Sequence, residues 1–232
     1  MFLKGCSLRC PWCSNPENLN YQIEKYIKDG KEGVYGRDYT CDEIFEEVMQ
    51  DKAFYDEDGG VTFSGGEALL QAAELIPLLS RFKQEGMTTA VETCLFVPTE
   101  NLLSVIHLID FFYVDMKIMN VDSCKEVEKG DLSLYLANLD ELIKRKKITV
   151  RIPVIGGYTD GEKNRKSVIE EIKKREFGIF KIELIKEHNL AESKYKSLGM
   201  EMSYHGVSDE LMNQYKKEIE EVVSIPVEVC KI

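Results

Sequence analysis

Strand-like and helix-like segments alternate along most of this chain. The strand-like segments are rich in β-branched and aromatic residues, and the helix-like ones carry apolar residues at helical spacing. The strands are expected at residues 60–64, 87–92, 111–116, 148–154, 177–185 and 225–229, and the helices at 67–82, 99–108, 132–145, 160–175 and 208–222. This alternation predicts βαβ units and a parallel sheet, and therefore an α/β fold. Right-handed crossovers allow an open doubly wound sheet, a full barrel or a partial barrel, and the pattern alone does not choose among them.

Before the first expected strand, the chain is predicted to contain a loop and one helix. Gly30, Gly33 and Gly36 mark the loop. Thr40, followed three residues later by Glu43, is the sequence signature of a capping box and predicts the start of the helix. The 232 residues contain no internal repeat, low-complexity tract or linker, and they suffice to bury one core. We therefore expect a single domain, residues 1–232.

Charge and hydropathy argue against several classes of protein. The formal net charge of -11 disfavours a nucleic-acid partner, because phosphate binding needs a positive surface. No apolar run approaches the ~18–20 residues that span a bilayer. No secretory signal opens the sequence. Seven cysteines in such a chain predict reduced thiols in the cytoplasm, with metal binding or catalysis ahead of a disulfide framework.

Three of the cysteines, Cys6, Cys10 and Cys13, lie within eight residues. Thiolates select zinc, copper(I) or iron–sulfur clusters. A structural zinc site normally has four protein ligands, and no fourth ligand is evident in the local sequence. Three thiolates fit a four-iron cluster whose remaining iron is open to a substrate. A non-catalytic iron–sulfur or zinc protein, used for electron transfer or as a scaffold, is the alternative from a different class.

Polar residues stand at the ends of five expected strands. They are Ser64, Gly65, Gly66 and Glu67, then Glu92 and Thr93, then Asp115 and Lys117, then Arg151, and finally His188. Because the carboxyl ends of parallel strands meet at one edge of a sheet, we expect these residues around one cleft. Each also has an ordinary structural interpretation: a tight glycine turn, a salt bridge at the sheet rim, or a structural histidine. Their gathering at one edge favours a functional site.

The string from Gly5 to Glu17, GCSLRCPWCSNPE, resembles the cluster motif of radical S-adenosylmethionine enzymes. Trp12 and the Asn15-Pro16-Glu17 sequence make it similar, more narrowly, to the activating enzymes of glycyl-radical enzymes. The resemblance extends from Phe2 almost to the C-terminus. It implies a partial (β/α)6-type parallel barrel that lacks the family's first N-terminal segment, which holds a strand and a Gly-Pro-Gly-x-Arg turn.

The resemblance also implies roles for individual residues. It makes Cys6, Cys10 and Cys13 the ligands of one 4Fe-4S cluster. It makes S-adenosylmethionine contacts of Ser64, Gly65, Gly66, Glu67, Glu92, Thr93, Asp115, Lys117, Arg151 and His188. Glu67 is expected to accept from the amino group of the methionine moiety, and His188 to lie near the adenosine. A monovalent cation is expected near Asp115. Cys94 departs from the family pattern, and we expect it to be a small packed residue and not a ligand.

The implied reaction needs no general base. Reduced flavodoxin or ferredoxin supplies one electron, S-adenosylmethionine is cleaved to methionine and a 5′-deoxyadenosyl radical, and the radical removes hydrogen from a glycine of a partner glycyl-radical enzyme. The cofactors carry the chemistry, and the protein orients them. The alternative within enzymes is a radical reaction on another peptide or on a small molecule.

Overall fold

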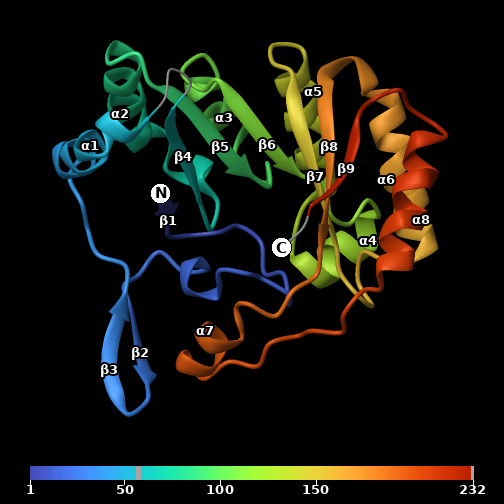
Figure 1. Ribbon diagram of the computed structural model, residues 1–232, viewed down its shortest axis with the longest axis horizontal. Coiled ribbons are helices and arrows are strands. Elements are labelled where there is room, and N and C mark those ends of the chain that lie inside the picture. The colour runs from blue at the N-terminus through green and yellow to red at the C-terminus, as the bar shows by residue number, and fades with distance from the viewer. Residues whose placement is uncertain (56–58, 231–232) are drawn as a thin grey trace.

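The computed structural model describes residues 1–55 and 59–230, and it contains the expected parallel sheet. All neighbouring strands of this sheet run parallel, in the order β1-β4-β5-β6-β7-β8-β9 (Figure 1). The strands are β1 Phe2–Leu3, β4 Gly60–Gly65, β5 Thr88–Thr93, β6 Phe111–Asp115, β7 Ile148–Val154, β8 Ile179–Lys186 and β9 Val227–Cys230. The six expected strands are confirmed to within two residues at each end.

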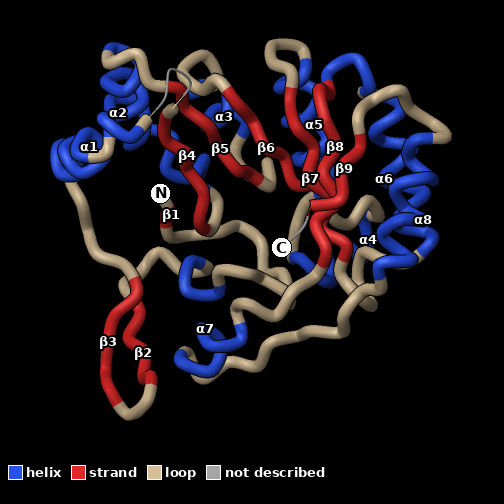
Figure 2. The backbone as a smooth tube through the Cα atoms, in the orientation of Figure 1, coloured by secondary structure: helices blue, strands red, loops and turns tan. Residues whose placement is uncertain are grey.

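The strand order decides between the architectures that the sequence left open. Spatial order follows chain order without a reversal, so the sheet is wound in one direction and is not doubly wound. Among the described residues the end strands β1 and β9 do not pair with each other, so the barrel is partial. The helices cover one side of the curved sheet (Figures 1 and 2). The predicted partial parallel barrel is therefore confirmed.

The expected helices are present, with one late start. They are α1 Cys41–Gln50, α2 Ala72–Gln84, α3 Thr99–Val105, α5 Leu132–Ile143, α6 Glu162–Lys174 and α8 Asp209–Glu220. Thr40 and Glu43 form the predicted capping box, with Thr40 Oγ1 accepting from the Glu43 N–H at 3.2 Å. Helix α2 starts five residues later than expected because residues 68–71 form a 3₁₀ turn. None of the described helices is long and apolar enough to cross a bilayer.

Several short elements were not expected. The predicted glycine loop is wrong in part, because Glu24–Lys28 (β2) and Lys31–Tyr35 (β3) form an antiparallel hairpin. Its turn is Asp29-Gly30, with φ of 51° and 73°, which is the left-handed geometry that tight hairpins favour. Strand β1 and the helices α4 (Val121–Ser123) and α7 (Glu192–Ser197) are also additions.

Two glycines at the end of β4, Gly65 and Gly66, bring the N-terminal segment onto the sheet. Gly65 has a φ of +118°, which side-chain-bearing residues rarely adopt. A Cβ on Gly66 would lie 2.2 Å from the Gly5 carbonyl oxygen. The Gly66 N–H donates to Leu3 at 2.8 Å, and the Glu67 N–H donates to Gly5 at 2.7 Å. This contact fixes the start of the cysteine motif at the carboxyl end of β4.

A buried asparagine holds the chain after β5. The Asn138 side chain is fully buried and donates to the carbonyls of Leu95 and Val97 at 2.9 and 2.8 Å. Its Oδ1 accepts from the Thr99 hydroxyl at 2.7 Å. The Leu95 backbone has a φ of 58°, so this turn needs support from its surroundings.

Replacing Asn138 with leucine should destabilise the fold, because leucine cannot donate the hydrogen bonds that Asn138 makes to the Leu95 and Val97 carbonyls. Two buried carbonyls would lose their donors, and we expect the free energy of unfolding to fall by about 3 kcal/mol. Urea denaturation followed by circular dichroism measures this loss. Lys166→Ala, on the exposed face of α6, serves as the control and should leave the urea midpoint unchanged. An equal midpoint for both variants would contradict the role given to Asn138.

Candidate active site

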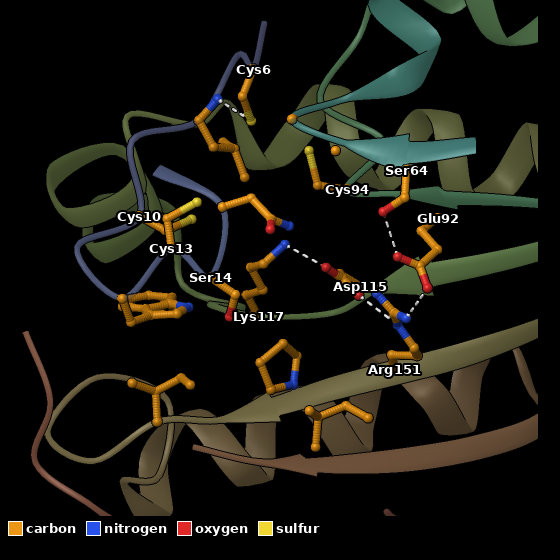
Figure 3. Close-up of a pocket in the computed structure, with 18 of the residues that line it drawn as sticks. Cys6, Cys10, Cys13, Ser14, Ser64, Glu92, Cys94, Asp115, Lys117 and Arg151 are labelled. Atoms are coloured by element: carbon orange, nitrogen blue, oxygen red, sulfur yellow. Dashed lines mark hydrogen bonds and ion pairs between the residues drawn. The ribbon is translucent and has the colours of Figure 1, made fainter. Parts of the chain in front are cut away.

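A cavity of about 320 Å³ lies at the carboxyl ends of the strands. Twelve of the thirteen residues predicted from the sequence line it: Cys6, Cys10, Cys13, Ser64, Gly65, Gly66, Glu92, Thr93, Asp115, Lys117, Arg151 and His188. Figure 3 shows the thiols and the charged side chains turned toward this space. The expectation that residues at the strand ends surround one cleft is confirmed for these twelve. Glu67 does not line the cavity.

The three clustered thiols share the cavity wall. Cys10 and Cys13 lie side by side, with Cys6 farther along the wall (Figure 3). All three are free thiols. Among residues 1–55 and 59–230, no three His, Cys, Asp or Glu side chains converge as the ligands of a single metal ion do. The irons of a 4Fe-4S cluster stand apart and take one thiolate each, so spaced thiols around one cavity fit such a cluster.

The surroundings of the three thiols differ. The pKa of Cys6 is lowered to about 7, first by a hydrogen bond with the Cys94 thiol and then by the Leu8 N–H, against the effect of burial. Burial raises the pKa of Cys10 well above its ordinary value and that of Cys13 to about 11. Cys6 is therefore the thiol that loses its proton most easily, as an iron ligand must.

A chain of charges crosses four neighbouring strands. Ser64 on β4 donates to Glu92 on β5 at 2.5 Å, and Arg151 Nη1 on β7 reaches the other oxygen of Glu92 at 2.6 Å. Arg151 Nε also contacts Asp115, at the end of β6, at 3.1 Å. Lys117 Nζ lies 2.9 Å from the second oxygen of Asp115. The sheet brings Asp115 and Arg151 together directly, because they are paired in the register of β6 and β7.

This chain of charges keeps Asp115 and Lys117 ionised despite burial. Burial alone would raise the pKa of Asp115, but Lys117 and Arg151 together hold it below its ordinary value. Burial likewise opposes the charge on Lys117, and Asp115 with the nearby Cys10 outweighs it, so the Lys117 pKa lies well above its usual range. The cavity thus presents both fixed cations and fixed anions, the complement of a zwitterion.

Glu67 does not face the cavity. It is fully buried, and its oxygens accept from the Leu69 N–H at 3.0 Å, the Cys94 N–H at 2.7 Å and the Thr93 hydroxyl at 2.8 Å. Burial raises the pKa of Glu67, against these hydrogen bonds. The Glu67 carboxylate therefore does not reach the cavity in this structure, and its expected contact with an ammonium group stays a prediction. Glu67 instead ties the end of β4 to the end of β5.

Comparison with known proteins identifies the family. The profile of the Radical SAM superfamily matches residues 1–166. The chain belongs to the radical SAM superfamily. It is 33% identical to the pyruvate formate-lyase 2-activating enzyme of Escherichia coli K12, covering 86% of this chain and 74% of that one. It is 29% identical to the choline trimethylamine-lyase activating enzyme of Oleidesulfovibrio alaskensis, covering 89% of this chain and 83% of that one.

Solved structures share the fold of this radical SAM protein. A domain of the pyruvate-formate lyase-activating enzyme from Bacteroides vulgatus superimposes with a TM-score of 0.62 at 26% identity, covering 75% of this chain and 99% of that one. A radical SAM methyltransferase from Sphaerobacter thermophilus gives a TM-score of 0.68 at 14% identity, covering 97% and 63%, and shows the fold alone. The family uses a 4Fe-4S cluster and S-adenosylmethionine, and the three thiols and the charged cavity fit these two groups.

Some cavity neighbours were missed from the sequence of this radical SAM protein. Glu128 is fully buried and accepts a hydrogen bond from the Cys10 thiol at 3.6 Å, and its carbonyl accepts from the Arg9 N–H at 2.8 Å. It ends a short π-helical segment, and the segment stops at Lys129 with a φ of 62°. No periodic signal marks so short an element. Cys94 is buried as expected, but it also lines the cavity beside Cys6.

The Glu92–Arg151 pair should show energetic coupling. Both side chains are largely shielded, with exposed fractions of 30% and 22%. A double-mutant cycle with Glu92→Gln and Arg151→Gln, measured by urea denaturation, should give a coupling free energy of about 1 kcal/mol. The exposed Glu162–Lys166 pair of α6 is the control and should show no measurable coupling. Coupling no larger than in the control would mean that the charges do not act as one chain.

Proposed function

We propose that this protein activates a glycyl-radical enzyme by reductive cleavage of S-adenosylmethionine. One observation carries the proposal: three cluster-competent thiols and a chain of fixed charges share one cavity at the carboxyl ends of the strands. Its curated relatives are named activating enzymes for such partners. The cluster, when bound, supplies the electron that breaks a carbon–sulfur bond of S-adenosylmethionine. The residues of the protein orient the bound groups and exclude water from the cavity.

In this proposal Cys6, Cys10 and Cys13 hold the cluster, and the charged chain holds the amino acid end of S-adenosylmethionine. Arg151 and Lys117 offer cations to the carboxylate. Because Glu67 is turned away, Glu92 takes its place as the acceptor for the ammonium group, with Ser64 beside it. Gly65 and Gly66 leave the backbone accessible to the same group. Thr93 orients the end of β5 through its bond to Glu67.

The adenosine end is proposed to lie toward His188, which follows β8. His188 lines the cavity together with Ile185 and Met202, which offer apolar surface to a purine and exclude water. The His188 ring is oriented by the Leu190 N–H, which donates to Nδ1 at 3.3 Å.

A monovalent cation near Asp115 is part of the proposal. Asp115 is balanced here by Lys117 and Arg151. If a substrate carboxylate draws either cation away, Asp115 needs another positive charge, and a monovalent cation supplies it without adding a side chain. Measuring S-adenosylmethionine binding in potassium and in tetramethylammonium salts tests whether a monovalent cation binds beside Asp115. Tighter binding is expected in potassium.

The proposal extends to the protein's partners and setting. Reduced flavodoxin or ferredoxin is the expected electron donor, and a glycine-bearing enzyme is the substrate. We treat residues 1–232 as one domain because the buried apolar residues form one cluster that extends from Leu8 to Val227. A cluster held by reduced thiols suits the cytoplasm.

Formation of 5′-deoxyadenosine tests the chemistry. After anaerobic cluster reconstitution, the wild-type protein with dithionite and S-adenosylmethionine should form 5′-deoxyadenosine, measured by chromatography. Cys10→Ala should form none, because the cluster loses a ligand. A well-formed cluster in the wild type that yields no nucleoside would favour the non-catalytic iron–sulfur protein.

Electron paramagnetic resonance tests activation itself. Incubation with a glycyl-radical enzyme should give the doublet of a glycine radical, and pyruvate formate-lyase and choline trimethylamine-lyase are the first partners to try. Nucleoside formation without a doublet from any such partner would retain the radical chemistry and reject activation. The protein would then act on another peptide or on a small molecule.

Binding measurements distinguish Glu92 from Glu67. Glu92→Gln should weaken S-adenosylmethionine binding by about tenfold, because a charged hydrogen bond is lost. Glu67→Gln keeps one accepting oxygen and acts on the cavity only through the ends of β4 and β5, so it should weaken binding less than Glu92→Gln does. Equilibrium dialysis with labelled S-adenosylmethionine measures both. The reverse order of effects would restore Glu67 as the direct contact.

A further inference from the structure

The short helix α7 lies against the loop that follows Cys13 (Figure 1). Its lysine, Lys194, makes three contacts there. The ammonium group donates to the Asn15 side-chain oxygen at 2.9 Å and to the Ser14 carbonyl at 3.3 Å, and it pairs with Glu17 at 2.6 Å. All three acceptors lie within four residues of Cys13. One side chain from far along the sequence therefore ties down the exit of the cysteine motif.

The neighbouring tyrosine contacts the motif itself. Tyr195 is only 3% exposed, and its hydroxyl donates to the Cys13 carbonyl at 3.0 Å, with the Pro11 carbonyl at 3.4 Å. Burial and the nearby thiols raise its pKa, so the phenol keeps its proton and remains a donor. Carbonyls of the motif that the local backbone leaves unpaired thus receive a partner from α7.

Other bonds hold the far end of this loop: the Gly5 and Cys6 N–H groups donate to the carbonyls of Asn18 and Leu19, and the Lys4 ammonium group donates to the Glu17 carbonyl. The 3₁₀ turn of the loop, Pro16–Asn18, follows Asn15, and the Asn15 side chain makes no capping bond to the backbone. The Asn15 amide oxygen is used by Lys194 instead. Only one of the two carboxylate oxygens of Glu17 is partnered, by Lys194, and the other is buried without a partner. Removing Lys194 would leave this carboxylate without the only ion pair that it makes in the described structure.

We propose that Lys194 and Tyr195 form a clasp that positions Cys13 for the cluster, so both are positioning residues and not ligands. The proposal rests on the proposed function, because that function makes Cys13 a cluster ligand. The clasp also gives the Asn15-Pro16-Glu17 sequence a physical role. The side-chain oxygens of Asn15 and Glu17 accept from the Lys194 ammonium group.

Helix α7 joins this loop to two other parts of the chain. It begins four residues after His188, so the clasp links the wall that carries His188 to the loop that carries Cys13. Ser197 at its end bonds to Tyr35 of the β3 strand at 3.1 Å. The position of the Cys13 thiol thus depends on a helix that is tied both to the wall that carries His188 and to the β2–β3 hairpin.

Hydrogen exchange of the cluster-free protein tests the clasp directly. In Lys194→Met, amides of residues 13–19 should exchange about tenfold faster than in the wild type, because the loop loses three bonds. Lys196→Met is the matched control, since Lys196 sits two residues away, is 74% exposed and, among the described residues, pairs only with Glu192 of its own helix. It should exchange as the wild type does. Equal exchange in Lys194→Met and the control would overturn the proposal.

Cluster retention provides the second measurement. In reconstituted protein, loss of visible absorbance to an iron chelator should be about tenfold faster in Lys194→Met than in Lys196→Met, and Lys194→Arg should restore most of the resistance. Should Lys194→Met fail to fold, Glu17→Gln breaks the same pair from the other side and should show the same loss. Chelator rates equal to the control in both variants would reject the clasp. The exchange measurement uses no cluster, so failure of the proposed function leaves it interpretable.

Discussion

The site depends on one close backbone approach, between the glycine turn after β4 and the N-terminal segment. Gly66 lies so near Gly5 and Asn18 that a Cβ would sit 2.2 and 2.5 Å from their carbonyl oxygens. Hydrogen bonds from Gly66 to Leu3 and from Gly5 to Asn18 hold the contact. A larger residue at position 66 would push the cysteine motif off the sheet, and every other relation in the cavity would change with it.

The order of the strands in the sheet then determines which charged side chains meet in the cavity. Because spatial order follows chain order, β4, β5, β6 and β7 each place a polar residue beside that of the next strand. Ser64, Glu92, Arg151 and Asp115 therefore form one continuous chain of hydrogen bonds. A doubly wound sheet would separate some of these strands. The arrangement of charges in the cavity is thus a consequence of the strand order. Each buried charge lies beside a neighbour of opposite sign, which offsets the cost of its burial.

The sequence predicts the parts of the molecule that repeat with a period. Strands such as 148–154 alternate or run apolar over their whole length, so they are found to within two residues. The direction of a side chain has no such signal. The motif therefore identifies Glu67, but the sequence places its carboxylate in the cavity, whereas the structure buries it between β4 and β5. Glu128 and Lys194 were missed because their partners, Cys10 and Glu17, lie more than a hundred residues away. The β2–β3 hairpin was missed although Asp29-Gly30 is a turn signal, because Gly33 and Gly36 just after the turn favoured a loop.

The cysteine motif is held by polar bonds to distant segments as well as by the core, in which Leu8 and Trp12 are buried. The glycine turn holds Gly5, the segment ending at Glu128 holds Arg9, and α7 holds Cys13. These three anchors come from three separate regions of the chain, so the thiols reach their places only when the whole fold is formed. Such anchoring fixes the ligand positions before a cluster binds, which lowers the entropy lost on binding. Together with the burial of Leu8 and Trp12, these three polar contacts hold the thiols in place before a cluster binds.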